Sequence, residues 1–158
     1  MILKSLPVNE VLNKLEYYCS YQDRCYKEVE YKLFEYHLTP EEKQNILIAL
    51  IENKYLNEER FAISFTRGKH FYKNWGRNKI KQELKFRDIS ARNIETALKE
   101  INEAYETRFL AYAEKKWESI NEKDILKKKN KFISQLSYKG YESHLIFDFL
   151  NDIENKKA

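Results

Sequence analysis

The chain has 158 residues, of which 42% are hydrophobic and 34% are charged, and its formal net charge is +4. Only three glycines and two prolines occur, too few for the turns of a β-sandwich or a Rossmann-type fold, so the composition predicts helices. No apolar run approaches the length of a membrane span, residues 1–7 are too short and polar for a signal peptide, and the two cysteines are expected to be reduced thiols in a cytosolic protein.

The first predicted helices lie in residues 1–57. Apolar side chains from Val11 to Tyr18 follow a helical rhythm, and a connection is expected near residues 23–26. Val29 and Leu33 are four residues apart and therefore share one face of a second helix. This helix is expected to end near His37, in a left-handed backbone position, before a third helix that starts at a Thr-Pro-Glu-Glu cap.

The next predicted helices lie in residues 58–104. Asn57 caps a helix in which Phe61, Phe65 and Tyr72 are expected to be core residues because of their spacing. A tight connection follows at residues 74–76. There Gly76 is expected to supply a backbone conformation that other residues resist, and Trp75 either packs against the connection or stacks on a partner, with packing favoured.

The same apolar pattern occurs three times along the chain. The residues that repeat are Val29, Leu33 and Leu38, then Ile80, Leu84 and Ile89, then Phe132, Leu136 and Tyr141. The spacing between copies is 51 and then 52 residues, and each copy leads into a further amphipathic stretch. The sequence therefore predicts an all-α fold of three tandem three-helix repeats, at residues 1–57, 58–104 and 105–158. Units this small are expected to stack into an elongated, curved array, of either right or left hand.

Positive charge is concentrated in the middle repeat. Residues 67–87 contain eight basic residues and one acid, whereas residues 1–57 carry a net charge of −2. The candidate contact residues are Arg67, Lys69, Lys73, Arg77, Lys79, Lys81, Lys85 and Arg87, with a second run at Lys127, Lys128 and Lys129. Such cation clusters suit a phosphate backbone or an acidic protein surface, although a solvated helix face remains the alternative, above all for the second run.

Catalytic signatures are absent from the sequence. The three histidines are dispersed, and no Ser/His/Asp arrangement, phosphate-binding glycine loop or metal-spaced ligand set occurs. The chain is therefore expected to be no enzyme, with no cofactor, no metal, no small-molecule substrate and no membrane association.

A resemblance to the RecX family becomes visible in the middle repeat. The residues that carry it are the run from Tyr55 to Ala62, then Phe65, Arg67, Lys69, Trp75, Gly76, Ile80, Glu83, Leu84, Ile89 and Ser90. Arg24, Val29 and Leu33 extend the resemblance into the first repeat, where Cys25 stands at a position that is Ser in many members. RecX proteins modulate the bacterial RecA recombinase, so the resemblance implies a curved helical protein that binds in the groove of a RecA–DNA filament and restrains filament growth, ATP turnover and strand exchange, with weak contacts to DNA.

Two other functions remain open at this point. Three-helix units with basic helices also resemble stand-alone helix-turn-helix proteins, which read duplex DNA by placing one helix in the major groove. A pure protein-interaction scaffold is the third alternative, and it predicts no affinity for DNA even at low salt.

Overall fold

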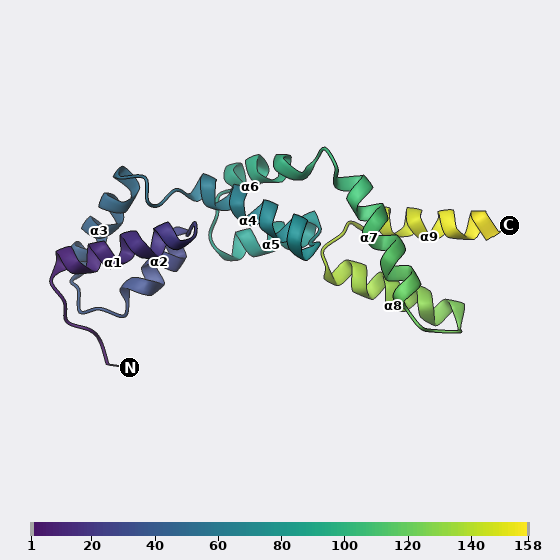
Figure 1. The fold of residues 1–158 in the computed structure, drawn as a ribbon, viewed down its shortest axis with the longest axis horizontal. Coiled ribbons are helices and arrows are strands. Elements are labelled where there is room, and N and C mark those ends of the chain that lie inside the picture. Colours follow the sequence, from purple (N-terminus) through teal and green to yellow (C-terminus); the bar gives the residue numbers. More distant parts are fainter. Residues whose placement is uncertain (1, 158) are drawn as a thin grey trace.

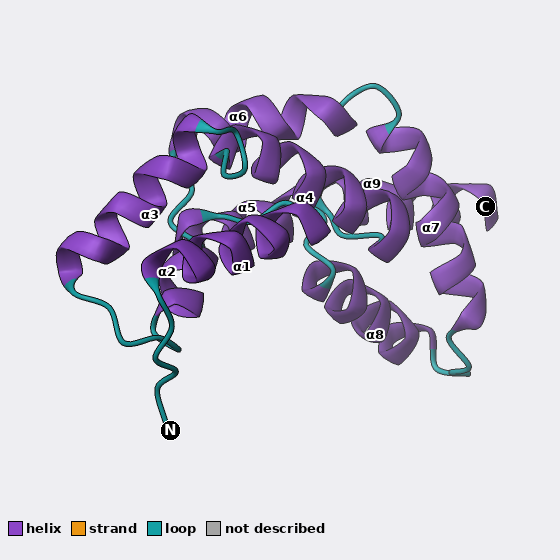
Figure 2. Ribbon diagram, turned by 60° about the vertical axis from the view of Figure 1, so that its left-hand side comes forward, coloured by secondary structure: helices purple, strands orange, loops and turns teal. Residues whose placement is uncertain are grey.

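In the computed structural model, which describes residues 2–157, the chain consists of helices joined by short connections (Figures 1 and 2). The helices are α1 (Val8–Tyr21), α2 (Tyr26–Leu33), α3 (Pro40–Glu52), α4 (Glu58–Lys73), α5 (Arg77–Phe86), α6 (Ala91–Leu98), the 3₁₀ turn η1 (Lys99–Ile101), α7 (Tyr105–Ser119), α8 (Ile125–Tyr138) and α9 (Ser143–Lys157). Over residues 2–157 no strand forms, and the single isolated β-bridge pairs Lys4 with Tyr36.

The helices form three groups that follow one another along the long axis of the molecule (Figure 1). We call α1–α3 the first unit, α4–η1 the second unit and α7–α9 the third unit. Helices pack mainly within their own unit, for example α4 against α6 and α8 against α9. The predicted all-α, elongated arrangement of helical repeats is confirmed, while the residue boundaries given for the three repeats stay a prediction.

The predicted helix starts are confirmed. The side chains of Thr39, Asn57 and Ser90 accept hydrogen bonds from the backbone N–H groups three residues later, at the starts of α3, α4 and α6. Each of these bonds satisfies a backbone donor that the first helical turn leaves without a partner.

The predicted left-handed helix ends are confirmed in two of the three units. Asp88 and Gly140 have φ angles of 58° and 96°. His37 is not among the residues of positive φ, so the prediction for the first unit was wrong. The reason is that the N-terminal segment pairs with this turn: Lys4 N–H donates to Glu35, and His37 N–H donates to the carbonyl of Lys4.

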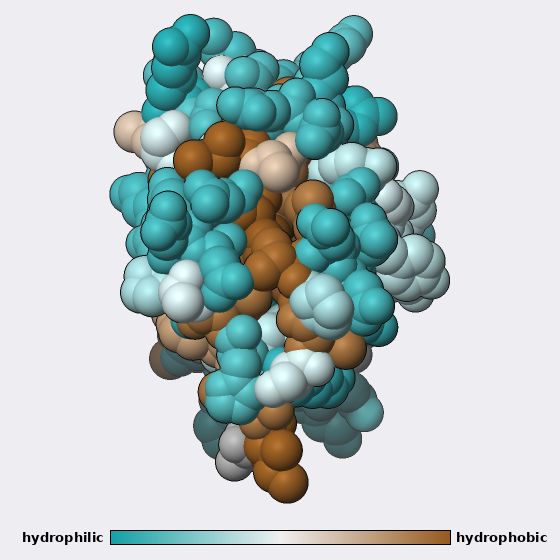
Figure 3. Space-filling view, turned by 90° about the vertical axis from the view of Figure 1, so that its left-hand side faces the viewer, coloured by the Kyte–Doolittle hydropathy of each residue, from teal (hydrophilic) through white to brown (hydrophobic). Residues whose placement is uncertain are grey.

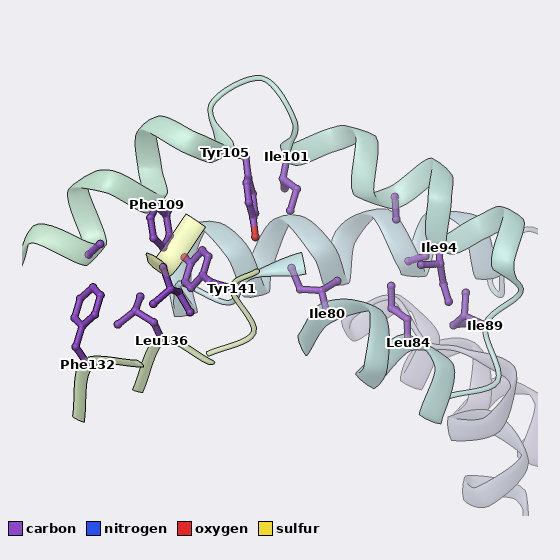
Figure 4. Packing of buried hydrophobic residues seen from close by; sticks show 14 of the residues in the cluster. Ile80, Leu84, Ile89, Ile94, Ile101, Tyr105, Phe109, Phe132, Leu136 and Tyr141 are labelled. Atoms are coloured by element: carbon purple, nitrogen blue, oxygen red, sulfur yellow. The ribbon is translucent and has the colours of Figure 1, made fainter. Parts of the chain in front are cut away.

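Two separate hydrophobic cores hold the molecule together. One lies inside the first unit and includes Val11, Leu15, Leu33 and Leu50. The other is continuous through the second and third units, so that Ile80 and Leu84 belong to the same cluster as Phe109, Phe132 and Leu136 (Figure 4). The second and third units therefore share one core, while the first unit has its own.

The buried face of helix α4 agrees with the prediction at the start of the helix but not at its end. Phe61 is buried and Phe65 half-buried, but Tyr72 is 85% exposed, so its assignment to the core was wrong. The buried stripe passes instead through Thr66 and His70. Tyr72 lies two residues beyond His70, a rotation of about 200° on a helix of ~3.6 residues per turn, and therefore on the opposite side.

The junction between the second and third units is a direct contact of two backbones. Gly76 N–H donates to the carbonyl of Lys139 at 2.7 Å, and Asn78 N–H donates to that of Gly140 at 2.9 Å. Gly76 has a φ angle of −83°, so the expectation of a special backbone conformation was wrong. Glycine is required there for space, because a Cβ on Gly76 would lie 2.5 Å from the carbonyl of Gly140.

The junction between the first and second units joins the buried Cys25 to the core of the second unit and adds polar contacts around it. Asp23 accepts hydrogen bonds from Arg60 and Ser64, Tyr26 N–H donates to Glu58, and the ammonium of Lys27 donates to the carbonyl of Phe86. Arg60 forms an ion pair with Asp23 at 2.8 Å across this junction.

Apolar side chains also reach the surface at the end of the first unit. The view onto that end shows a strip of hydrophobic side chains flanked by polar ones (Figure 3). Exposed apolar residues of this unit include Ile2, Ile48 and Ile51. The first unit therefore exposes apolar side chains, which its net negative charge does not indicate.

Candidate functional site

The predicted basic residues are distributed over three helices. Arg67, Lys69 and Lys73 lie on α4, Arg77, Lys79, Lys81 and Lys85 on α5 with Arg87 directly after it, and Lys127, Lys128 and Lys129 on the first turns of α8. The structure divides these eleven side chains by what they contact.

Two of the arginines are neutralised by acids of their own unit. Arg67 forms an ion pair with Glu100 at 3.4 Å, and Arg87 pairs with Glu83 at 2.9 Å while its guanidinium packs on the ring of Phe65. Charges in such pairs attract a distant polyanion less than free charges do.

Arg77 is a structural residue at the junction of the second and third units. Its guanidinium lies over the ring of Tyr105 at 3.7 Å, donates to Glu142 at 2.9 Å and donates to Asn102 at 3.0 Å. Its backbone N–H donates to the hydroxyl of Tyr105, which in turn donates to Glu142. Tyr105 is fully buried, and this burial raises the pKa of its phenol well above the usual range, so the phenol stays neutral and Glu142 supplies the negative charge that faces Arg77.

Lys81 and Lys85 point to solvent. They are one helical turn apart on α5, on the flank beside the buried Ile80 and Leu84, and both are exposed. In the part of the chain that the structure describes, neither takes part in an ion pair. These two lysines are therefore free to meet an anionic partner.

A second group of cations gathers where the third unit meets the second. It consists of Lys73 at the end of α4, Lys79 on α5, Lys116 on α7 and Lys139 after α8, and we call these four residues the junction cluster. Burial and then the positive charges of Lys79, Lys116 and Lys73 lower the pKa of the Lys139 ammonium. That ammonium is half-buried and donates to the carbonyl of Lys73 at 3.1 Å, which fixes its position within the cluster.

Lys73 and Lys79 are among the residues predicted from the sequence, whereas Lys116 and Lys139 are not. Lys116 belongs to a short Lys115–Lys116 pair and Lys139 stands alone, so neither lies in a dense basic run. Lys139 joins the cluster because the contact between Gly76 and Gly140 brings the end of α8 onto the start of α5.

Aromatic rings line the same region. The ammonium of Lys79 lies 4.5 Å from the centre of the Trp75 ring and 4.2 Å from that of Tyr138, and Lys69 also lies over Trp75. Trp75 itself packs edge-on against Phe65, which supports the packing role expected for it. A groove of about 520 Å³ runs between α5 and α8, with Lys79, Phe86 and Tyr138 among its lining residues.

The second basic run does not join the junction cluster. Lys128 packs over Trp117, Lys129 pairs with Glu154, and Lys127 is exposed. Lys128 precedes Lys139 by eleven residues, which on a helix corresponds to about 16 Å. The two ends of α8 thus carry separate positive regions.

Other kinds of site are not supported by the described residues. Within residues 2–157, no three His, Cys, Asp or Glu side chains come together in a way that could hold a metal ion. In the same range, no helix combines the length and apolarity that crossing a membrane requires. Cys19 and Cys25 are both free and buried, as expected for reduced thiols.

Comparison with known proteins gives consistent matches. A family model described as the second three-helix domain of RecX matches residues 57–98, and a model of the third three-helix domain of RecX matches residues 104–150. Together these two ranges cover more than half of the chain.

Individual relatives carry the same description. The chain is 38% identical over 92 residues to a regulatory protein RecX of Vibrio parahaemolyticus, covering 58% of this chain and 57% of the relative. It is 29% identical over 157 residues to a regulatory protein RecX of Halalkalibacterium halodurans, covering 99% of this chain and 59% of the relative. The chain therefore spans little more than half the length of these relatives.

Solved structures share the fold. A crystal structure of RecX from Lactobacillus salivarius superposes with a TM-score of 0.78 and 25% identity, covering 93% of this chain and 96% of that one. A second crystal structure, of a regulatory protein RecX, gives a TM-score of 0.80 at 21% identity, covering 91% and 73% of the two chains.

Proposed function

Because this chain belongs to the RecX family, we propose that it is a non-catalytic regulator of the RecA recombinase that binds the RecA–DNA filament. The three units would lie along the filament groove and contact neighbouring RecA subunits, with the DNA backbone close to the junction cluster. Occupation of the groove would hinder entry of a second DNA strand and would perturb subunit addition and ATP turnover, so inhibition is the expected sign.

The junction cluster is the observation that carries this proposal. Four like charges held together by the fold repel one another; burial lowers the pKa of Lys139, and this repulsion lowers it further. Such an arrangement costs stability in the free protein, and the repulsion is relieved when an anion binds. A phosphate backbone supplies regularly spaced anions and releases counterions on contact, so it is a suitable partner for the cluster.

The free lysines of α5 extend the proposed contact. Lys81 and Lys85 are exposed and unpaired in the described structure, so they can approach phosphates or acidic side chains of RecA without breaking an internal bond. Arg67, Lys69, Arg87 and the run Lys127–Lys129 remain in the proposal as peripheral contacts, since most of them already have an aromatic or acidic partner. Arg77 contributes by holding the second and third units together.

Co-sedimentation with RecA filaments on single-stranded DNA tests the proposal. The informative variants are Lys73→Glu/Lys116→Glu, in the junction cluster, and Lys81→Glu/Lys85→Glu, on α5. The matched control is Lys99→Glu/Lys123→Glu, which changes the net charge by the same amount at exposed positions outside both groups. Arg77 is left unchanged, because replacing it would break the junction itself.

We expect wild type and the control variant to sediment with the filaments, and each test variant to bind the filaments at least tenfold more weakly. The salt dependence of binding should fall in both test variants, because fewer counterions are released. Equal sedimentation of all four proteins would contradict the assigned surface.

Measuring the binding of duplex DNA in the absence of RecA distinguishes the helix-turn-helix alternative from backbone contact. The helix-turn-helix alternative requires tight binding to a preferred sequence. Backbone contact alone gives weak binding that declines steeply with salt and is the same for all sequences.

A further inference from the structure

The first unit contains a second candidate site, outside the residues that the RecX models match. It is a cleft of about 660 Å³ between α1, the following loop and the Lys4–Tyr36 bridge. Its lining residues are Lys4, Asn13, Lys14, Leu15, Tyr17, Tyr18, Tyr21, Arg24, Lys32 and Tyr36. Four of these ten side chains are tyrosines, four are cations and none is an acid, although residues 1–57 are acidic as a whole.

Two of the tyrosines are not held by the core. Tyr17 and Tyr21 are 72% and 74% exposed, whereas Tyr36 is buried and Tyr18 half-buried. Both exposed rings lie on α1, one helical turn apart, so they project from the same face. Their Cα atoms are about 6 Å apart along the helix axis, close enough for one strand to contact both rings.

The cations of the cleft fall into two classes. Arg24 lies 3.8 Å from the centre of the Tyr18 ring, donates to the carbonyl of Tyr18 and faces Glu28, so it shapes the wall of the cleft. Lys32 is paired with Glu35 at 2.8 Å. Lys4 and Lys14 are exposed and form no ion pair within the described residues, while the pKa of Glu35 is lowered by its partner Lys32 and, more weakly, by the nearby charge of Lys4. The cleft thus has two exposed positive charges beside its open rings.

We propose that this cleft binds single-stranded nucleic acid, with bases stacked on Tyr17 and Tyr21 and phosphates held by Lys4 and Lys14. Exposed aromatic rings beside free cations are the combination that single-strand sites use, because every base has a face that stacks and every link has a charge. The site concerns direct binding by the first unit and does not depend on any interaction with RecA.

An acidic peptide is the competing occupant, and the cleft fits it less well. Carboxylates are recognised best by the paired donors of an arginine, but the one arginine here is already engaged with Tyr18 and Glu28. Two largely exposed phenol rings would add little to the recognition of a carboxylate. A base instead uses the rings directly.

The test measures binding of labelled oligo-dT and of an abasic oligonucleotide of the same length to the full chain, without RecA. Stacking predicts that wild type prefers oligo-dT to the abasic strand. Tyr17→Ala/Tyr21→Ala should weaken oligo-dT binding at least fivefold and leave abasic binding unchanged, and Tyr17→Phe/Tyr21→Phe should bind oligo-dT like wild type. Lys14→Glu should weaken both probes alike.

Tyr31→Ala is the matched control, because Tyr31 is 79% exposed in the same unit but does not line the cleft. Circular dichroism checks that the variants, all at exposed positions, keep their helices. The inference is overturned if the double alanine variant binds oligo-dT like wild type. It is also overturned if oligo-glutamate of equal charge displaces oligo-dT as well as unlabelled oligo-dT does. Since RecA is absent, neither result bears on the filament proposal.

Discussion

The three glycines of the chain should respond to alanine in three different ways, because each has different surroundings. Gly140 has a φ angle of 96°, and an added Cβ would lie 2.4 Å from the backbone nitrogen and the Cβ of Lys79. Gly76 has ordinary dihedral angles but would place its Cβ 2.5 Å from the carbonyl of Gly140. Gly68 lies inside α4, with nothing within 4 Å of the added atom.

The loss of stability expected for Gly140→Ala has two causes. A non-glycine residue in the left-handed region costs about 1–2 kcal/mol. To reach an ordinary contact distance, the end of α8 must also move about 1 Å away from α5, which breaks or weakens the two junction hydrogen bonds, each worth roughly 0.5–1.5 kcal/mol. Together these costs lower the free energy of unfolding by about 2–5 kcal/mol.

Alanine at the other two glycines should cost less stability or increase it. Gly76→Ala carries only the separation cost, about 1–3 kcal/mol. Gly68→Ala removes a glycine from an open helix position and should raise stability by about 0.5–1 kcal/mol. Both junction variants should also bind filaments more weakly, because they shift Lys79 and Lys139 relative to each other.

Urea unfolding followed by circular dichroism measures all three variants. The expected order of stability is Gly68→Ala above wild type, then Gly76→Ala, then Gly140→Ala. Junction variants as stable as wild type would refute the close contact between the second and third units, and with it the geometry of the junction cluster.

Three further predictions concern titration, thiol chemistry and charge. Burial lowers the pKa of His70 below its usual value, so the unfolded chain binds the proton more strongly than the native protein does. Stability should therefore fall as the pH drops through and below about 6.5, by less than ~1.4 kcal/mol per pH unit. In urea unfolding measured over a pH series, His70→Gln should remove this contribution to the pH dependence. Burial raises the thiol pKa of Cys19 to about 11 and that of Cys25 to about 12. An aromatic disulfide reagent at pH 8 should therefore label neither thiol in the native protein and both thiols in urea. Rapid labelling of the native protein would contradict their burial. Lys73→Gln removes one repulsive charge from the junction cluster. At low salt, the melting temperature of this variant should equal or slightly exceed that of wild type, while its binding to filaments should be weaker. A marked loss of stability would show that Lys73 is structural.

The helices were predictable because their signals are local. The caps at Thr39, Asn57 and Ser90 and the repeated apolar pairs are contained in short stretches of sequence. Local signals failed where distant segments override them. His37 lacks the left-handed conformation because the N-terminal segment binds its turn, and Tyr72 is exposed because the polar residue His70 takes the buried position.

The candidate site was predictable only in part, for the same reason. The density of positive charge on α4 and α5 is visible in the sequence, but the roles of its members are not. Arg77 looks like one more surface cation until Tyr105 and Glu142, from the third unit, are seen to surround it. Lys139 carries no sequence signal and enters the cluster through a backbone contact between two glycines.

The most direct test of the proposed regulatory role is RecA-driven strand exchange, measured together with DNA-stimulated ATP hydrolysis by RecA, at a near-stoichiometric ratio of this protein to RecA. We expect wild type and Lys99→Glu/Lys123→Glu to reduce both activities, and Lys73→Glu/Lys116→Glu to reduce them much less at the same concentration. Strand exchange and ATP hydrolysis that stay unchanged on addition of the wild-type protein would contradict the proposed role.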